Sequence, residues 1–153
     1  MLNNKLYSLA LVTAQLVLIM WICTRALPAK SDAVMIPAIL LIAAAGILAI
    51  AAIVTLRLRN LSVMPEPVRQ GELITSGPYQ YIRHPMYTSV LVACLGMLLL
   101  NFNLLSGTLL AALLAVLVLK VQREEMLLKA VYSGYDEYRK YTGALLPKFY
   151  KKQ

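Results

Sequence analysis

Four apolar segments restrict the folds that this chain can adopt. They cover roughly residues 6–24, 33–56, 86–100 and 104–120. A helix needs about 20 apolar residues to cross a hydrocarbon core of about 30 Å, so the last two segments are short. A soluble chain of 153 residues that is 60% hydrophobic would expose large apolar patches to water. We therefore expect an all-α polytopic membrane protein with four transmembrane helices, forming a single integral-membrane domain over residues 1–153.

The way these segments begin and connect adds detail to this expectation. The last two are joined only by Asn101-Phe102-Asn103, which predicts a tight helical hairpin. Pro85 stands where the third segment begins, a favoured place for proline because an N–H would be unpaired there anyway. His84 then lies at or beside the helix cap. The first segment is long and lacks a small-residue cleavage site after it, so we expect a retained span rather than a signal peptide.

Positive charge is distributed unevenly over the two sides that these spans define. Of the 15 Lys and Arg residues, 13 lie at the start of the first span, in the loop 57–85 or from Lys120 onward; only Arg25 and Lys30 lie opposite. The positive-inside rule then places both termini, the loop 57–85 and the tail 121–153 in the cytoplasm. A minimal four-span chain favours a prokaryotic inner membrane, and the net charge of +8 suits anionic headgroups on this face.

The tail repeats apolar and aromatic side chains with helical spacing. Between Gln122 and Tyr141, one stripe is formed by Leu127, Val131, Tyr135 and Tyr138. Gly134 is expected to kink or interrupt this helix. The pattern predicts a C-terminal interfacial helix that lies back on the membrane face.

Two kinds of partner are not expected from the sequence. It contains no basic recognition element, so we expect no nucleic-acid partner. One histidine and two cysteines without ligand spacing predict no metal site built by the protein.

Two polar clusters border the third and fourth segments. The first holds Tyr79, Tyr81, Arg83, His84 and Tyr87, and the second is Glu124-Glu125. A hairpin returns both clusters to the same membrane face, where they can meet. Carboxylates suit a cation or sugar hydroxyls, arginine suits a carboxylate, and aromatic faces suit a sulfonium or a heterocycle. The residues alone equally allow a snorkelling arginine, an interfacial tyrosine belt and two solvated glutamates.

Two stretches resemble the signature of the isoprenylcysteine carboxyl methyltransferase and phospholipid methyltransferase superfamily. The first is ELITSGPY at 72–79 followed by YIRHPMY at 81–87. The second starts at Arg123-Glu124-Glu125 and continues through YSGYDEY at 132–138 to Leu146-Pro147. The resemblance implies an integral-membrane methyltransferase that uses S-adenosylmethionine and acts on a membrane-embedded or lipid-linked acceptor. The chain has no G-x-G-x-x-G motif, which fits a cofactor site without a Rossmann domain.

The resemblance also implies a role for each matching position. The cofactor would be bound by Gly71, Glu72, Leu73, Ile74, Tyr79, His84, Pro85, Met86, Tyr87 and Glu125. His84 and Arg83 are the candidate catalytic residues, and Arg123 and Glu124 would lie on the substrate side. A carboxylate acceptor needs no general base, whereas an amine acceptor must lose a proton, for which His84 is the natural side chain. We favour a role for His84 in the cofactor cradle.

One position departs from the resemblance and leaves the acceptor open. Animal isoprenylcysteine enzymes carry an arginine where this chain has Val121, and Lys120 or Arg123 could replace it. The acceptor atom could thus be a carboxylate oxygen, a phospholipid amine or a thiolate. Two other functions stay open, an NADPH-dependent reductase like the membrane sterol reductases, which share an RHP-x-Y block, and a non-enzymatic membrane protein. The oligomeric state is open as well.

The charge distribution predicts the topology directly. Single cysteines placed at Ser76 and Lys152, in a background without Cys23 and Cys94, should react with membrane-impermeant maleimide only after the cells are opened. Labelling of either position from outside intact cells would contradict the predicted orientation.

Overall fold

The computed structural model describes residues 2–26, 32–56 and 73–149, and this part of the chain is helical. Its elements are α1 (Leu2–Ala26), α2 (Asp32–Leu56), the 3-10 helix η2 (Gly77–Gln80), α3 (Pro85–Leu100), α4 (Leu104–Val131) and α5 (Tyr135–Tyr141). No strand occurs among the described residues, only an isolated bridge between Ile82 and Gly143. The expected all-α class is confirmed.

Three of these helices have the length and composition of membrane spans. The apolar stretches are Lys5–Ala26, Ala33–Leu56 and Leu104–Val131, whereas α3 is a shorter apolar helix. Many large apolar side chains of α1 and α2 point away from the protein, among them Leu16, Met20, Ile36, Leu40, Ile47 and Val54. Outward-facing apolar helices of this kind suit a lipid environment, because exposing so much apolar surface to water would be unfavourable.

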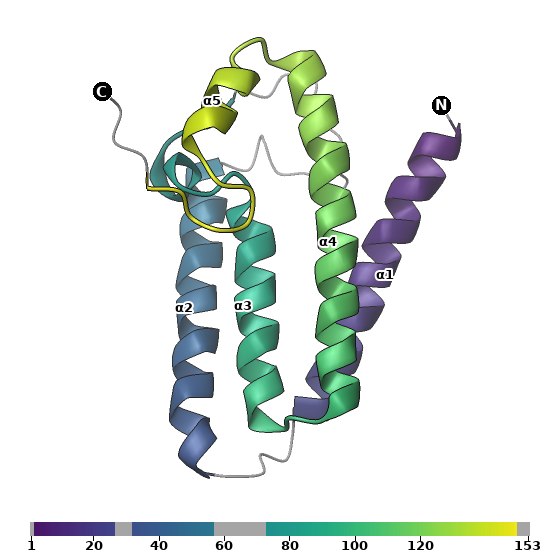
Figure 1. Ribbon diagram of the computed structural model, residues 1–153, viewed down its shortest axis with the longest axis vertical. Coiled ribbons are helices and arrows are strands. Elements are labelled where there is room, and N and C mark those ends of the chain that lie inside the picture. Colours follow the sequence, from purple (N-terminus) through teal and green to yellow (C-terminus); the bar gives the residue numbers. More distant parts are fainter. Residues whose placement is uncertain (1, 27–31, 57–72, 150–153) are drawn as a thin grey trace.

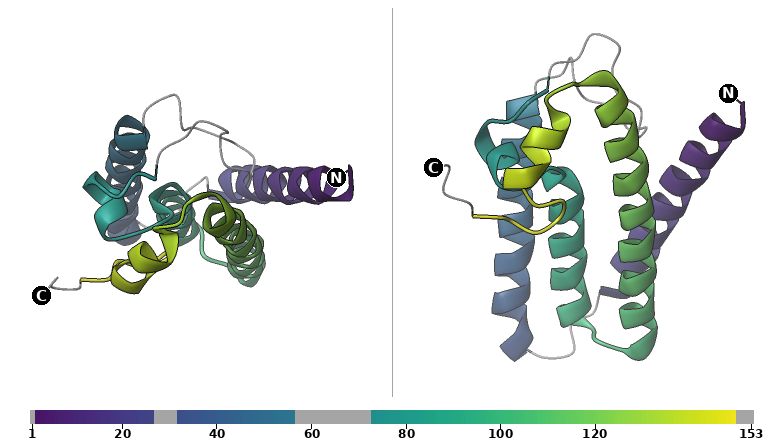
Figure 2. Two further views of the ribbon diagram at one scale, coloured as in Figure 1. Left: turned by 90° about the horizontal axis from the view of Figure 1, so that it is seen from above. Right: turned by 45° about the horizontal axis from the view of Figure 1, so that its top comes forward.

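The helix α3 is the centre of the bundle. It packs against α1, α2 and α4, and Figures 1 and 2 show it between α2 and α4 while α1 crosses behind α4 at an angle. A buried apolar cluster ties α1, α3 and α4 together through Ile22, Cys94, Leu109, Leu113 and Leu117. The N-terminal ends of α1 and α3 and the C-terminal ends of α2 and α4 lie at one end of the bundle, together with α5 (Figure 1).

The contact between α2 and α3 depends on small side chains. Ala38, Ala45 and Ala52, seven residues apart, are buried on one face of α2. On α3, a Cβ at Gly96 would lie 2.9 Å from the carbonyl oxygen of Ala38. Small residues at such a crossing let two backbones approach closely, which is how helices associate in lipid without a hydrophobic driving force.

The ends of α3 and α4 follow local signals. α3 begins at Pro85 with His84 at its N-cap, as predicted. Asn103 caps α4, since its side-chain oxygen accepts a hydrogen bond from the backbone N–H of Ser106 at 2.9 Å. Residues 101–103 connect the two helices, which run in opposite directions (Figure 1).

The expectation of a separate helix beginning after the fourth apolar segment is wrong. α4 continues without a break to Val131, so residues 122–131 belong to this helix and not to a separate tail helix. The reason is that residues 121–131 contain good helix formers and no Gly or Pro, so nothing ends the helix where the apolar segment ends. Gly134 does interrupt the tail, as predicted, and precedes the short α5. The four stripe residues therefore lie on two helices.

The close approach at Gly96 can be tested by overpacking. Gly96→Val should lower the stability of the detergent-solubilised protein by about 1 to 3 kcal/mol, because the side chain would force α2 and α3 apart. Gly46→Val is the matched control on α2, where nothing lies within 4 Å of the added Cβ. Thermal unfolding followed by circular dichroism measures both, and equal midpoints for the two variants would contradict this account of the packing.

Candidate functional site

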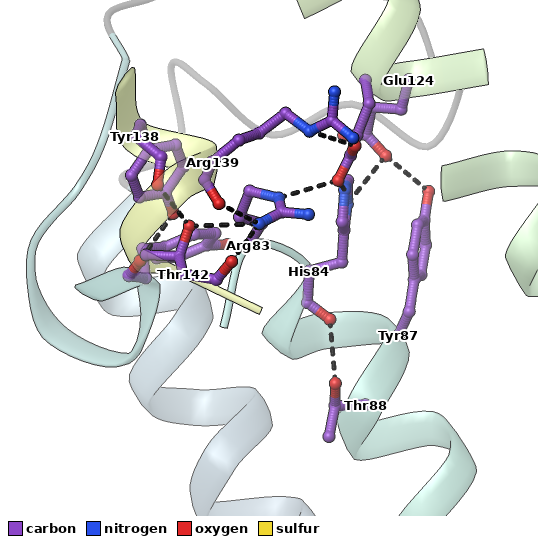
Figure 3. A network of polar contacts seen from close by, with 10 residues as sticks. Arg83, His84, Tyr87, Thr88, Glu124, Tyr138, Arg139 and Thr142 are labelled. Carbon is purple, nitrogen blue, oxygen red and sulfur yellow. Dashed lines mark hydrogen bonds and ion pairs between the residues drawn. The ribbon is translucent and has the colours of Figure 1, made fainter. Parts of the chain in front are cut away.

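The candidate site lies where α3 begins and α4 ends. At the start of α3, the carbonyl of His84 accepts hydrogen bonds from the N–H groups of Tyr87 and Thr88, both at 3.1 Å. The backbone thus caps the helix, and the imidazole makes no capping hydrogen bond. Its ring is buried and faces α4 (Figure 3).

The C-terminal segment holds residues 81–84 in place. Gly143 donates to the carbonyl of Tyr81 at 3.1 Å and accepts from the N–H of Arg83 at 2.8 Å, while His84 donates to Ala144 at 3.1 Å. A Cβ at position 143 would collide with the carbonyl of Leu146, so this turn requires glycine. Arg83 and His84 therefore present their side chains from a backbone that is fixed on two sides.

Arg83 joins three separate parts of the chain. Its Nε donates to Oε1 of Glu125 on α4 at 2.8 Å, and both side chains are about nine-tenths buried. Another nitrogen of its guanidinium donates to the backbone carbonyl of Thr142. Arg139 of α5 approaches the second oxygen of Glu125 at 3.2 Å (Figure 3). Glu125 thus forms ion pairs with two guanidinium groups and accepts a hydrogen bond from Arg83.

Glu124 makes a second set of contacts beside the first. Its Oε2 lies 3.4 Å from Nδ1 of His84 and accepts a hydrogen bond from the Tyr87 hydroxyl at 3.1 Å. The rings of His84 and Tyr87 are nearly parallel, with centroids 5.5 Å apart. Both contacts use the same oxygen of Glu124, whose side chain is 29% exposed. Its other oxygen has no partner among the described residues.

His84 lies between two carboxylates. Burial alone would lower the pKa of the imidazole, but Glu124 and Glu125 outweigh this effect and hold the pKa of His84 above its usual value. Nε2 is 3.6 Å from Oε1 of Glu125, which is too long for a hydrogen bond, so this nitrogen is buried without a hydrogen-bond partner within the described chain.

Tyrosines close the side of the cluster away from α4. Burial, together with the charge of Glu124, raises the pKa of Tyr79 to about 12, and burial also raises the pKa of Tyr135. Tyr138 donates its hydroxyl to the carbonyl of Tyr79 at 2.6 Å. The buried hydroxyl of Tyr135 has no hydrogen-bond partner in the part of the chain that is described. These phenols all stay protonated at neutral pH.

The structure brings together most of the residues singled out in the sequence. Arg83, His84, Tyr87, Glu124 and Glu125 form the contacts above, and buried Pro85 starts α3 beside them. The remaining described candidates do not share these contacts: Leu73, Ile74 and Met86 are half-buried, and the Arg123 guanidinium lies over the ring of Tyr7 on α1, 5.3 Å from its centroid. Gly71 and Glu72 lie outside the described residues.

Sequence reasoning missed several contributors. Arg139 and Thr142 contact the cluster from the tail, and Gln15 accepts a hydrogen bond from Lys120 across two helices. Arg139 follows directly on the tyrosine-rich block of the tail, which could have drawn attention to it. Thr142 acts through its backbone carbonyl, for which the sequence offers no signal.

This arrangement suits a ligand that carries both signs of charge. The free oxygen of Glu124 can accept from an ammonium group, and the guanidinium groups can donate to a carboxylate. The parallel rings of His84 and Tyr87 offer faces to a cation or a flat heterocycle. Two buried polar atoms of the described site, on His84 and Tyr135, have no hydrogen-bond partner in the described part of the chain. The donor set therefore fits S-adenosylmethionine.

The raised pKa of His84 makes stability depend on pH. Its charged contacts with Glu124 and Glu125 should contribute fully below about pH 6.5, the pKa of an unfolded histidine, and fade as the pH rises through the higher folded value. Unfolding midpoints of the wild type should therefore fall across this range above about pH 6.5. His84 is the only histidine, so His84→Gln should flatten that slope. A slope that is equal in both proteins would exclude this coupling.

Comparison with known proteins places the sequence in a family. The family model for phospholipid methyltransferase matches residues 33–134, more than half of the chain. The nickel-cobalt-cadmium resistance protein NccN of Alcaligenes xylosoxydans xylosoxydans is 32% identical over 81 residues, and so is the cobalt-zinc-cadmium resistance protein CzcN of Cupriavidus metallidurans. The matched part is 52% of this chain but only 38% of each relative. The family match covers most of α2 and all of α3 and α4. It therefore includes the site residues Arg83, His84, Tyr87, Glu124 and Glu125. The chain belongs to the phospholipid methyltransferase family of integral-membrane methyltransferases.

Proposed function

We propose that this protein transfers a methyl group from S-adenosylmethionine to a membrane-embedded or lipid-linked acceptor. The observation that carries the proposal is the meeting of two adjacent carboxylates with Arg83, His84 and Tyr87 at one end of an apolar bundle. When bound, S-adenosylmethionine supplies an electrophilic methyl group on a positively charged sulfur. The chain itself has to bind, orient and exclude water.

The two glutamates have different roles in this proposal. Glu125 is committed to Arg83 and Arg139, so it chiefly orders the site and holds the guanidinium groups where a carboxylate can meet them. The resemblance assigns Glu125 to the cofactor and Glu124 to the substrate side; we propose instead that an oxygen of Glu124 would accept from the ammonium group of the cofactor. A carboxylate that pairs with a cation in the ground state does not by itself speed up a reaction in which that charge disappears. Both residues therefore bind and orient.

Aromatic groups would cradle the rest of the cofactor. Tyr79 and Tyr87 stay neutral and offer ring faces to a sulfonium. Pro85 and Met86 form the first turn of α3 beside them, and Leu73 and Ile74 precede η2. We extend the cradle to Gly71 and Glu72 on the resemblance alone.

The pKa of His84 bears on whether the acceptor loses a proton when it is methylated. Because two neighbouring carboxylates raise the pKa of His84, its neutral form is less populated than in a free histidine, which makes it a weaker candidate for a general base near neutral pH. This supports an acceptor that reacts without losing a proton, such as the carboxylate of an isoprenylcysteine-like molecule, over the amine of a phospholipid. Arg83 is engaged by Glu125 and Thr142, so we assign it a positioning role.

We also propose that all four long helices cross the membrane with both termini in the cytoplasm. α3 has 16 residues and is about 24 Å long, less than a full hydrocarbon core. Because α3 is short, its first residue, and with it the site, would lie within the membrane just below the cytoplasmic surface. The cofactor would then enter from the cytoplasm and the acceptor from the lipid.

Cofactor binding tests the proposal. Calorimetry on the detergent-solubilised protein should show binding of S-adenosylmethionine and none of NADPH, which a reductase would need. Glu124→Gln should weaken the binding of S-adenosylmethionine roughly 10- to 150-fold, the loss of a charge-assisted hydrogen bond of about 1.5 to 3 kcal/mol, with a smaller loss of stability than Glu125→Gln. Glu125→Gln should weaken both binding and stability, because two guanidinium groups lose their carboxylate.

Glu137→Gln is the control, since its carboxylate is exposed and pairs with Lys140 on α5. Binding of NADPH in place of S-adenosylmethionine, or unchanged affinity in both Glu124→Gln and Glu125→Gln, would overturn the proposal.

A further inference from the structure

A buried lysine lies deeper in the bundle than the site described above. Lys120 stands one helical turn before Glu124 on α4, on the side toward the middle of the span. It is sixteen residues after Leu104, about 24 Å along the helix, which in the proposed topology places it at the cytoplasmic edge of the hydrocarbon core. Only 2% of its surface is exposed. Ionisable residues at such a depth are costly and commonly mark a functional site.

The contacts of this ammonium group are incomplete. Its Nζ donates to the side-chain oxygen of Gln15 on α1 at 2.6 Å and lies 5.0 Å from the centroid of the Tyr87 ring. Among the described residues, no carboxylate lies within ion-pair distance of Nζ. An ammonium group has three donors, of which a neutral amide accepts one here. Within the described chain the ammonium group therefore makes no direct ion pair, although the charge of Glu124 acts on it from one helical turn away, and it has donor capacity left.

We propose that Lys120 binds the anionic group of the methyl acceptor, a carboxylate or a phosphate carried on an apolar tail. In the absence of the acceptor, the amide oxygen of Gln15 stands where an oxygen of that anion would lie. An anion would neutralise a charge whose burial is otherwise poorly compensated, which gives the site its selectivity for charged over neutral lipids. The inference rests on the proposed methyl transfer only in naming the bound anion as the acceptor.

Tyr87 connects this lysine to the proposed cofactor site. Its ring faces Lys120, and its hydroxyl donates to Glu124. A group bound at Lys120 would thus be a neighbour of the Glu124 and His84 cluster, separated from it by one aromatic ring. The apolar tail would extend toward α1 and the lipid, because Lys120 faces α1 through Gln15.

The experiment compares ligands that share a tail and differ in head group. Palmitate, hexadecyl phosphate and hexadecanol are titrated into the protein in an uncharged maltoside detergent, with calorimetric detection. The wild type should bind at least one anion roughly tenfold or more tightly than hexadecanol, as expected for a charge-assisted hydrogen bond. The better of the two anions identifies the group as carboxylate or phosphate.

Variants at and near Lys120 test whether this lysine causes the preference for anions. Lys120→Met should abolish the preference for the anion, and Lys120→Arg should retain it. Lys129→Met is the matched control on the same helix, because Lys129 is half-exposed and pairs with Asp136. Gln15→Met removes the neutral group that occupies the place of the anion and should tighten anion binding.

The outcomes separate this inference from the proposed function. A wild type without preference for anions, or a preference that survives Lys120→Met, would overturn the anion site. Should Lys120→Met fail to fold, Gln15→Met decides, since unchanged or weaker anion binding there would equally contradict the inference. An anion preference that depends on Lys120 in a protein that does not bind S-adenosylmethionine would uphold the anion site and reject methyl transfer.

Discussion

The buried contact between Arg83 and Glu125 determines how the rest of the site is arranged. It joins residues 42 positions apart, one before α3 and one near the end of α4. A charge pair this far from water is stable only when further hydrogen bonds satisfy it, and removal of one partner costs about 3 to 5 kcal/mol. The carbonyls of Thr142 and Arg139 accept hydrogen bonds from the Arg83 guanidinium, and the guanidinium of Arg139 pairs with the second oxygen of Glu125. The C-terminal segment is therefore part of the site, because without it only Nε among the Arg83 donors would have the hydrogen bond described here.

This arrangement makes His84 part of a network of interacting polar groups rather than an independent base. Its imidazole lies against both glutamates, and their negative charge outweighs the effect of burial on its pKa. Tyr87 adds a hydroxyl to the same carboxylate and a ring parallel to the imidazole. Each group is held by the others, so the geometry exists before any ligand binds. For a displacement that needs alignment more than acid or base chemistry, such preorganisation is the main contribution that a protein can make.

The sequence predicted these features to different degrees, for physical reasons. The lengths of the apolar segments predicted the long helices, and the preference of proline for the first helical turn predicted the start of α3. The expected hairpin predicted that the two polar clusters lie at the same end of the bundle. The end of α4 was missed because helix formers continue past the apolar stretch, and hydropathy measures a membrane boundary rather than a helix end. Thr142 contributes a carbonyl that every residue possesses. Gln15 meets Lys120 across 105 residues, a contact that depends on how α1 crosses α4 and that no local pattern encodes.

The division of the chain between matched and unmatched residues suggests how such a protein could change its acceptor. The family match at 33–134 contains Arg83, His84, Tyr87, Lys120 and both glutamates, whereas α1 precedes it. α1 nevertheless supplies the groups that face the positive residues of α4, with Gln15 on Lys120 and Tyr7 under Arg123. Because α1 leans away from α4 toward its N-terminal end (Figure 1), we expect changes in this helix to alter the proposed acceptor side of the site and to leave the carboxylates in place. The chemistry of methyl transfer would then reside in α3 and α4, and the choice of acceptor in how α1 packs against them.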